Sequence, residues 1–249
     1  MLRGSLHRSL AVALCIGAAF FALLAFRQAP ITANGDGIVE GFRLVEAASA
    51  ADAMEQLYGK RQYMVHDMRP LAQTKFAGPA VTVLMKKEEN REGAAAIQGA
   101  LDTIDEAPAG SVYVMTLDDG LDYAGIGGLM STAMKFRNLA GAVVDGSVRD
   151  TAQIARLQFP VFSRGIAPSS TVSHYRFAGK NIALRCGGVE VRPGDIIVAD
   201  MDGVVVVPIE HAAAVLARAQ QLDNTEHSMY PFIEKFKSIR EAVAKFGRI

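Results

Sequence analysis

A buried apolar run between two helical patterns is the feature that most constrains the fold. Residues 139–145 (LAGAVVD) have no polar face, and such runs are typical of parallel strands that are covered on both sides. The spacing of apolar residues in segments 129–137 and 151–157, on either side of this run, predicts helices. This order predicts βα units packed around a buried sheet.

The last third of the chain has a different pattern, made of short strands and turns. Gly187-Gly188, residues 192–195 and Asp202-Gly203 are turn signals between the strands expected there. Those strands cover residues 181–186, 189–191, 196–200 and 204–207. Hairpins that follow βα units predict one α/β domain with a mixed sheet, and not a doubly wound parallel sheet.

Composition limits the kinds of protein that fit this chain. Half of the 249 residues are hydrophobic, so a sizeable core is expected. Lys plus Arg and Asp plus Glu each number 26, which gives no electrostatic reason to expect a nucleic-acid partner. Cys186 is the only cysteine after the first thirty residues, so a thiolate zinc site is not expected.

The first thirty residues differ from the rest. Residues 10–26 form an uncharged apolar run of 17 residues after a basic start, which predicts an export signal or an uncleaved membrane anchor in residues 1–30. We therefore expect an exported or membrane-anchored protein. A misplaced start codon or a buried first helix is the alternative, and would leave the protein cytoplasmic. Residues 31–41 are expected to be a linker, 42–222 the α/β domain and 223–249 a helical tail.

A glycine-rich turn at residues 125–130 is the first candidate for a binding site. It opens a predicted helix, and the free backbone N–H groups and dipole at a helix start bind anions such as a substrate carboxylate. The alternative is that the glycines only allow a tight turn from strand to helix.

Arg149 and Asp150, just after the buried run, are the second candidate. An arginine at the carboxyl end of a strand can bind a carboxylate or 2-oxo group, and an adjacent aspartate can hold a cation such as Mg²⁺. The alternative is a solvated arginine and an aspartate that caps the helix beginning at Thr151. Asp200 and Asp202, which flank a predicted turn, are expected to serve that turn alone.

Several segments together resemble the RraA-like family, which includes 4-hydroxy-4-methyl-2-oxoglutarate aldolases and non-catalytic regulators of ribonuclease E. The resemblance covers roughly residues 42–222. The segments that carry it are 51–54, 76–83, 127–150, 159–171 and 186–208.

The resemblance implies a swivelling α/β/β/α sandwich with a mixed sheet, assembled as a homotrimer or homohexamer with sites between subunits. It also implies a divalent cation, Mg²⁺ or Mn²⁺, and a small 2-oxo acid substrate. Asp150 would be the metal ligand, and Arg149 the catalytic residue that contacts the 2-oxo and carboxylate oxygens. The backbone amides expected to bind the substrate carboxylate are those of Gly127, Gly128, Leu129 and Met130.

The activity implied is that of a class II aldolase and decarboxylase. Such an enzyme would release pyruvate from 4-hydroxy-4-methyl-2-oxoglutarate-like acids and from oxaloacetate through a metal-stabilised enolate. Where the family's aldolases commonly have an acidic residue, this chain has Gly128, and Asp118, Asp119 or Asp122 are candidates to replace that acid through space. The alternative is a non-catalytic regulatory or binding protein on the same fold.

Overall fold

One long strand, β2 (Phe76–Lys87), joins the two halves of the sheet. In the computed structural model, which describes residues 35–72 and 74–248, the start of β2 pairs antiparallel with β10 and the rest pairs parallel with β3. The strand order is β1-β6-β5-β3-β2-β10-β11, with β4 beside β5 and β7 beside β2, and β8 and β9 form a separate hairpin. The sheet is therefore mixed, as expected.

The remaining strands are β1 (Arg69–Pro70), β3 (Val112–Leu117), β4 (Ala124–Ile126), β5 (Gly141–Val148), β6 (Val161–Ile166), β7 (Tyr175–Lys180), β8 (Leu184–Cys186), β9 (Val189–Val191), β10 (Ile196–Asp200) and β11 (Gly203–Val207). The helices are α1 (Gly35–Leu44), α2 (Ala47–Tyr58), α3 (Gln98–Glu106), α4 (Gly128–Phe136), α5 (Thr151–Leu157), α6 (Ala212–Phe236) and α7 (Ile239–Phe246), with short 3₁₀ turns η1 (Gly93–Ile97) and η2 (Ile209–His211).

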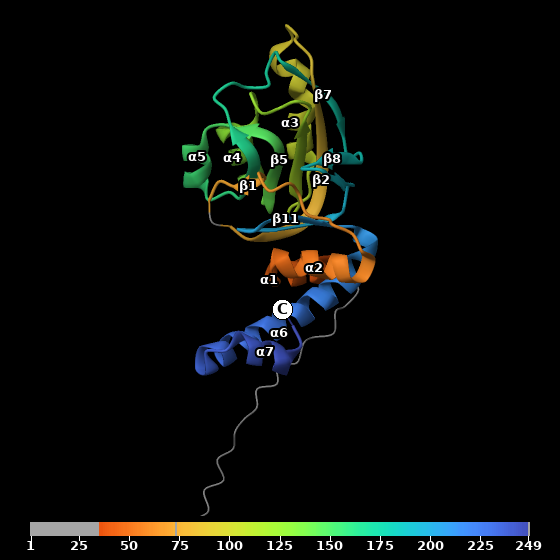
Figure 1. The fold of residues 1–249 in the computed structure, drawn as a ribbon. Helices are drawn as coiled ribbons and strands as arrows, with labels where there is room; N and C mark the ends of the chain where they lie inside the picture. The colour runs from red at the N-terminus through yellow and green to blue at the C-terminus, as the bar shows by residue number, and fades with distance from the viewer. Residues whose placement is uncertain (1–34, 73, 249) are drawn as a thin grey trace, which may run out of the picture. The chain divides into compact units, whose positions relative to one another are not determined.

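Three buried clusters define four layers. One cluster lies between the parallel strands and α3, α4 and α5, and a second lies between the two halves of the sheet. The third lies between β10, β11 and the helices α1, α2 and α6 (Figure 1). This arrangement is the expected α/β/β/α sandwich. Because β10 contributes Ile196 and Val198 to one cluster and Ile197 and Ala199 to another, both of its faces are buried.

Two expectations about the edges of the domain are wrong. Residues 35–41, which we expected to be part of a linker, lie in α1, because Ile38, Val39 and Phe42 pack against the third cluster. The expected end of the domain at residue 222 lies inside α6, whose buried face continues through Leu222 to Met229. The rest of the tail forms α7.

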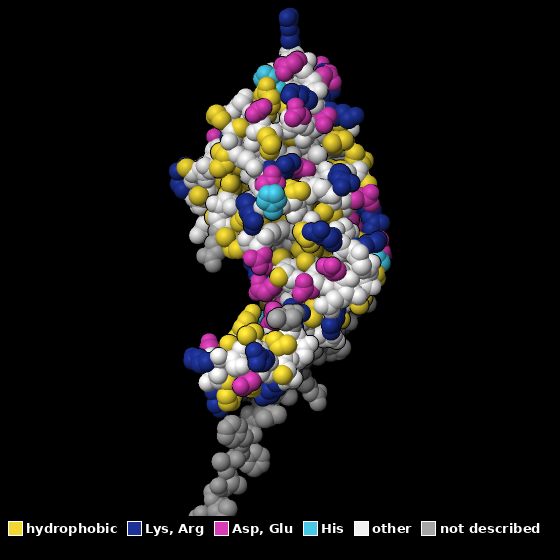
Figure 2. Space-filling model, in the orientation of Figure 1, with side chains coloured by type: hydrophobic (Ala, Val, Ile, Leu, Met, Phe, Trp, Pro, Cys, Tyr) yellow, Lys and Arg dark blue, Asp and Glu magenta, His cyan; other side chains and the backbone are white. Residues whose placement is uncertain are grey.

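The predicted leader, residues 1–30, lies outside the described residues. Among residues 35–72 and 74–248, no helix is long and apolar enough to cross a bilayer. Figure 2 shows basic and acidic side chains interspersed over the visible face of the molecule.

Candidate functional site

The site lies where β4 and β5 end side by side. These strands pair in parallel, with Ile126 opposite Val148, and the Arg149 N–H donates to the Ile126 carbonyl oxygen. The chain leaves β4 into the first turn of α4 and leaves β5 into Arg149 and Asp150. The two segments that the sequence singled out are thus brought together by the sheet.

Asp150 points back to the start of α4. Its backbone is left-handed, with φ 55° and ψ 35°, and its Oδ2 accepts the Gly128 N–H at 2.9 Å. Its side chain makes no capping bond to α5, so the alternative that it caps this helix is wrong. The start of α4 therefore already holds a carboxylate oxygen, as its dipole and free amides favour.

Gly127 is required for space. Its φ of −145° is extended backbone that any residue adopts. A Cβ placed there would lie 2.7 Å from Asp150 Oδ2 and 3.0 Å from Arg149 Cγ. The absence of a side chain at Gly127 therefore lets both charged residues approach the helix start.

Arg149 and Asp150 form a loose, accessible pair. Arg149 Nε lies 3.8 Å from Asp150 Oδ2, and the two side chains are 43% and 51% exposed. Such a pair in solvent contributes little to stability, so its charges remain available to a ligand.

A pocket of about 430 Å³ opens beside Asp150, between α4 and α5. Leu129 is 89% exposed at its rim, while the Met130 side chain packs against the core and leaves only its backbone amide at the helix start. The residues that line the pocket are Gly128, Leu129, Thr132, Asp150, Ala152, Gln153 and Arg156.

The sequence analysis missed Gln153 and Arg156. Their signal was the spacing of three residues from Asp150 to Gln153 and from Gln153 to Arg156, which places successive side chains near one face of a helix. Without knowing that this face borders α4, the spacing alone identified no site.

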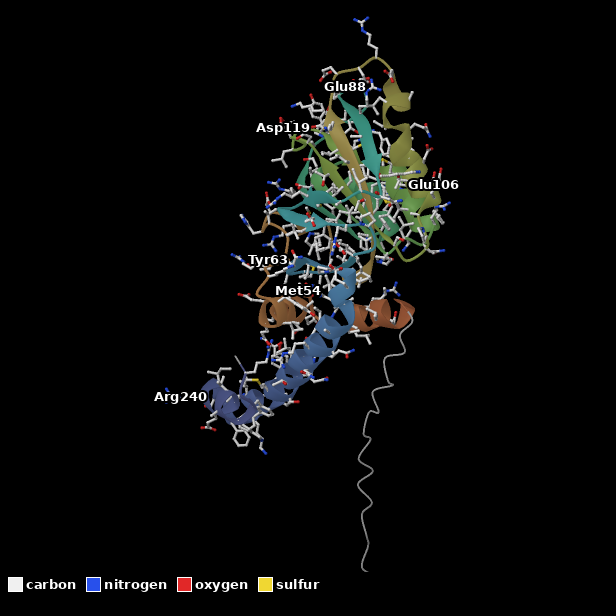
Figure 3. The ribbon with its side chains drawn as sticks, turned by 90° about the vertical axis from the view of Figure 1, so that its right-hand side faces the viewer. Met54, Tyr63, Glu88, Glu106, Asp119 and Arg240 are labelled. Carbon is white, nitrogen blue, oxygen red and sulfur yellow. The ribbon has the colours of Figure 1, made fainter. Side chains whose placement is uncertain are left out.

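The acidic loop residues do not build a metal site with Asp150. The described part of the chain holds no group of three or more His, Cys, Asp or Glu side chains able to bind a metal. Asp119 pairs instead with Lys87 at 3.0 Å, and Figure 3 shows it near Glu88. This ion pair raises the pKa of Lys87 above its ordinary value.

A second polar network links β5 and β6 to two neighbouring loops. Arg164 on β6 donates to Asp67 Oδ2 from Nε and Nη2, each at 3.0 Å, and to Asp145 Oδ1 at 3.1 Å. Asp145 Oδ2 accepts the Gly187 N–H at 2.7 Å. The Arg164 guanidinium lowers the pKa of Asp67, and burial raises the pKa of the Cys186 thiol. We interpret this network as structural, because it joins two loops to the sheet.

The structure thus combines a mixed-sheet α/β/β/α sandwich with a half-exposed arginine and aspartate at the start of a helix. Residues 47–206 match the family described as RraA-like: Aldolase/RraA. This chain belongs to that family, which confirms the resemblance found in the sequence.

Relatives and solved structures agree with the family assignment. A Halalkalibacterium halodurans protein provisionally named 4-hydroxy-4-methyl-2-oxoglutarate aldolase is 32% identical over 183 residues, covering 72% of this chain and 80% of that protein. An uncharacterised Pseudomonas syringae protein has a similar structure, with TM-score 0.77 and 25% identity over 86% of this chain and 96% of the other. Streptomyces coelicolor RraAS2, described as an unusual member of the RNase ES inhibitor RraA family, has TM-score 0.68 and 28% identity, covering 78% of this chain and 95% of the other.

Proposed function

We propose that this protein is a divalent-metal-dependent lyase that releases pyruvate from 2-oxo acids resembling 4-hydroxy-4-methyl-2-oxoglutarate, and from oxaloacetate. The observation that carries the proposal is the half-exposed Asp150 carboxylate, held at the start of α4 beside Arg149. Two relatives, 32% and 37% identical to this chain, are provisionally named 4-hydroxy-4-methyl-2-oxoglutarate aldolase, which supports the aldolase part of the proposal.

The residues present fit a divalent cation that is held by one protein carboxylate and completed by water and substrate. Asp150 Oδ2 is engaged by the Gly128 N–H, and the half-exposed carboxylate keeps its other oxygen for a ligand. Mg²⁺ is commonly held by one or two carboxylates, with water and substrate in the remaining positions. Asp150 suits that mode, whereas the described residues offer no set of three side chains for a cage made by protein alone.

Asp150, Arg149 and the first amides of α4 would each have a separate role in the reaction. A cation held by Asp150 would supply Lewis acidity toward a bound 2-oxo acid. The free amides at the start of α4 would bind the substrate's 1-carboxylate. As the carbon–carbon bond breaks, its electron pair moves onto the pyruvate half, and Arg149 would stabilise the charge that develops on the 2-oxo oxygen.

Protons must also balance in the aldol cleavage. The 4-hydroxyl group loses its proton as the new carbonyl forms, and the pyruvate half gains one at its methylene carbon. Asp150 is the only titratable acid among the residues that line the pocket. Solvent therefore carries these protons in our proposal.

One observation favours a second candidate function, a non-catalytic regulatory or binding protein. Gly128 brings no acidic side chain to the pocket, and one protein carboxylate gives weak metal binding. A structural relative is described as an unusual member of an RNase inhibitor family, which supports this second candidate.

A pyruvate-release assay separates the two candidates. Purified protein would be given oxaloacetate or 4-hydroxy-4-methyl-2-oxoglutarate with Mg²⁺, with Mn²⁺ or with chelator. We expect metal-dependent release that falls about 100-fold in Arg149→Ala and Asp150→Asn, since the loss of one charge-stabilising group costs on that order. Asparagine tolerates the left-handed backbone of Asp150, so this variant tests the charge and not the fold. No release with any metal would favour the non-catalytic candidate.

A further inference from the structure

Three residues of one helix face border the pocket. Asp150, Gln153 and Arg156 follow at intervals of three residues along the start and body of α5, and all three line the same pocket. Helical side chains lean toward the N-terminus of their helix, so the Arg156 side chain leans back toward Gln153 and Asp150. Six residues of helix correspond to about 9 Å along its axis, so the pocket extends from Asp150 at the start of α5 to its last turn.

Arg156 is held in place by Gln153. Gln153 Oε1 accepts hydrogen bonds from Arg156 Nε at 3.1 Å and Nη2 at 2.7 Å. Gln153 is in turn packed over Gly128, since a Cβ on that glycine would lie 3.1 Å from Gln153 Cγ. The glycine thus leaves room for a side chain that orients the arginine.

The guanidinium keeps one edge for a ligand. Gln153 occupies the edge formed by Nε and Nη2, and the edge formed by Nη1 and Nη2 is the one that can bind a carboxylate with two parallel hydrogen bonds. Within the described residues, no carboxylate forms an ion pair with Arg156, although several other arginines are paired.

The charges of the site are also unbalanced. Arg149 and Arg156 contribute two positive groups to the site, and Asp150 is the one acidic residue of the pocket, although the formal charges of the whole chain cancel. A bound divalent cation would increase that surplus. An anion with a single carboxylate would leave Arg156 without a partner, whereas a dianion would occupy both ends of the site.

We propose that Arg156, oriented by Gln153, binds the carboxylate at the far end of the substrate and selects dicarboxylic 2-oxo acids over monocarboxylic ones. This inference deepens the proposed function and rests on it for the position of the first carboxylate. Gln153 is then a positioning residue, and Arg156 a specificity-determining one.

Two substrates that differ at one group test the proposal. 4-Hydroxy-2-oxoglutarate and 4-hydroxy-2-oxopentanoate share the bond to be cleaved, and the second has a methyl group where the first has its distal carboxylate. We expect Arg156→Gln to lower kcat/KM about tenfold for the first substrate, mainly through KM, because a charge-assisted contact contributes on that order. The kcat/KM for the second substrate should not change. Gln153→Ala should likewise lower kcat/KM for the first substrate alone, and by less.

The chain offers a matched control. Arg218 on α6 donates to Gln56 Oε1 from Nε at 2.9 Å and from Nη2 at 2.7 Å, which reproduces the Arg156 and Gln153 pair far from the pocket in the fold. Arg218→Gln should leave both substrates unchanged. Equal losses on both substrates in Arg156→Gln, or no loss on either, would overturn the proposal.

A binding experiment keeps this inference separate from the proposed activity. Calorimetry with Mn²⁺ would compare 2-oxoglutarate with 2-oxopentanoate, two non-cleaved ligands with the same number of carbons. We expect the wild type to bind the dianion more tightly and Arg156→Gln to remove that preference. If the wild type releases no pyruvate yet shows this preference, the lyase proposal fails and the role of Arg156 stands; no preference in the wild type would overturn the role of Arg156.

Discussion

At the residue scale, Gly127 and Asp150 depend on each other. The carboxylate reaches the start of α4 only because no Cβ stands between them. A methyl group at Gly127 would have to displace the Asp150 oxygen and the Arg149 stem together. Since both of these are surface side chains, the fold itself can absorb the change.

We therefore expect Gly127→Ala to lower pyruvate release at least tenfold, because displaced Arg149 and Asp150 need raise the activation free energy by only about 1.4 kcal/mol to have that effect. The midpoint of unfolding in urea should barely change. Gly128→Ala is the matched comparison. Its Cβ would lie 3.1 Å from Gln153 Cγ and 3.3 Å from Asp150 Cβ, contacts that a small shift of the flexible Gln153 side chain and of Asp150 relieves, so the loss should be smaller. Equal activity in the wild type and Gly127→Ala would show that the close approach has no functional role.

Asp67 gives a prediction about pH. Arg164 lowers the pKa of the Asp67 carboxyl below its unfolded value, near 3.9, so their interaction stabilises the fold above that value and is lost as pH falls through the lower, folded pKa. Asp67→Asn should therefore be less stable than the wild type in urea at pH 7, and the difference should shrink as pH falls below about 4. Asp122→Asn controls for the loss of a loop carboxylate; a difference that grows in acid would contradict the assignment.

The types of the site residues could be predicted from the sequence, but not their orientation. Arg149 and Asp150 were identified from their place after a buried strand, and the sheet does bring them to the glycine turn. The direction of the Asp150 side chain depends on a left-handed backbone, which an aspartate adopts only in some contexts. Residues that cap a helix through their side chains are typically in the extended region, and Asp150 is not, so the alternative fails on backbone conformation.

At the scale of elements, the start of α2 is held by two distant carboxylates. Asp200 Oδ2 accepts the Ala47 N–H at 2.7 Å, and Asp223 Oδ2 accepts the Glu46 N–H at 3.1 Å. Asp200 also serves the expected turn, since its Oδ1 accepts the Asp202 N–H. Both carboxylates are buried, and they come from β10 and α6. No local sequence pattern before α2 could have indicated them.

Asp200→Ala should lower the free energy of unfolding by about 1–3 kcal/mol, because it leaves the buried Ala47 amide without an acceptor. Urea unfolding followed by circular dichroism measures the change. Asp200→Asn keeps one acceptor oxygen and should lose less. Equal stability of Asp200→Ala and the wild type would show that solvent replaces the cap.

The elements that were predicted well are those with local signals. The turns around β9 and β10 and the helix α5 lie where the sequence placed them, because glycine, proline and apolar spacing mark their ends. β7 was missed because Tyr175 is its one buried residue and its sequence does not alternate clearly; the strand is held by its contacts with β2 and α3. α1 was missed because its glycines concealed a short apolar face.

At the scale of the whole molecule, two large apolar side chains of α4 are exposed on the surface, where another subunit could cover them. Leu129 and Phe136 of α4 are 89% and 78% exposed, and they lie at either end of the helix that begins at the candidate site. The resemblance to the RraA-like family implies a homotrimer or homohexamer, and exposed apolar side chains of this kind are typical of subunit contacts. We propose that this chain assembles as such an oligomer, with α4 in or beside the contact.

Light scattering after size exclusion should give three or six times the 26.6 kDa chain mass. Phe136→Glu should shift the population toward smaller species at low micromolar concentration, since it places a charge in an apolar contact. Leu57→Glu, a change at a half-exposed residue of α2, is the control. A monomeric wild type would contradict the proposal.

The helix α2, near the start of the described residues, is held by segments from the last fifth of the chain, and this has a consequence for synthesis. α2 is packed by α6, its first amides are capped by Asp200 and Asp223, and Asp52 binds Arg248 across 196 positions of the chain. A ribosome adds about 5–20 residues per second, so the apolar face of α2 waits for its partners for on the order of ten seconds. Throughout that interval the nascent chain has no complete third core and offers α2 to chaperones, and any product truncated before α6 would stay in that state.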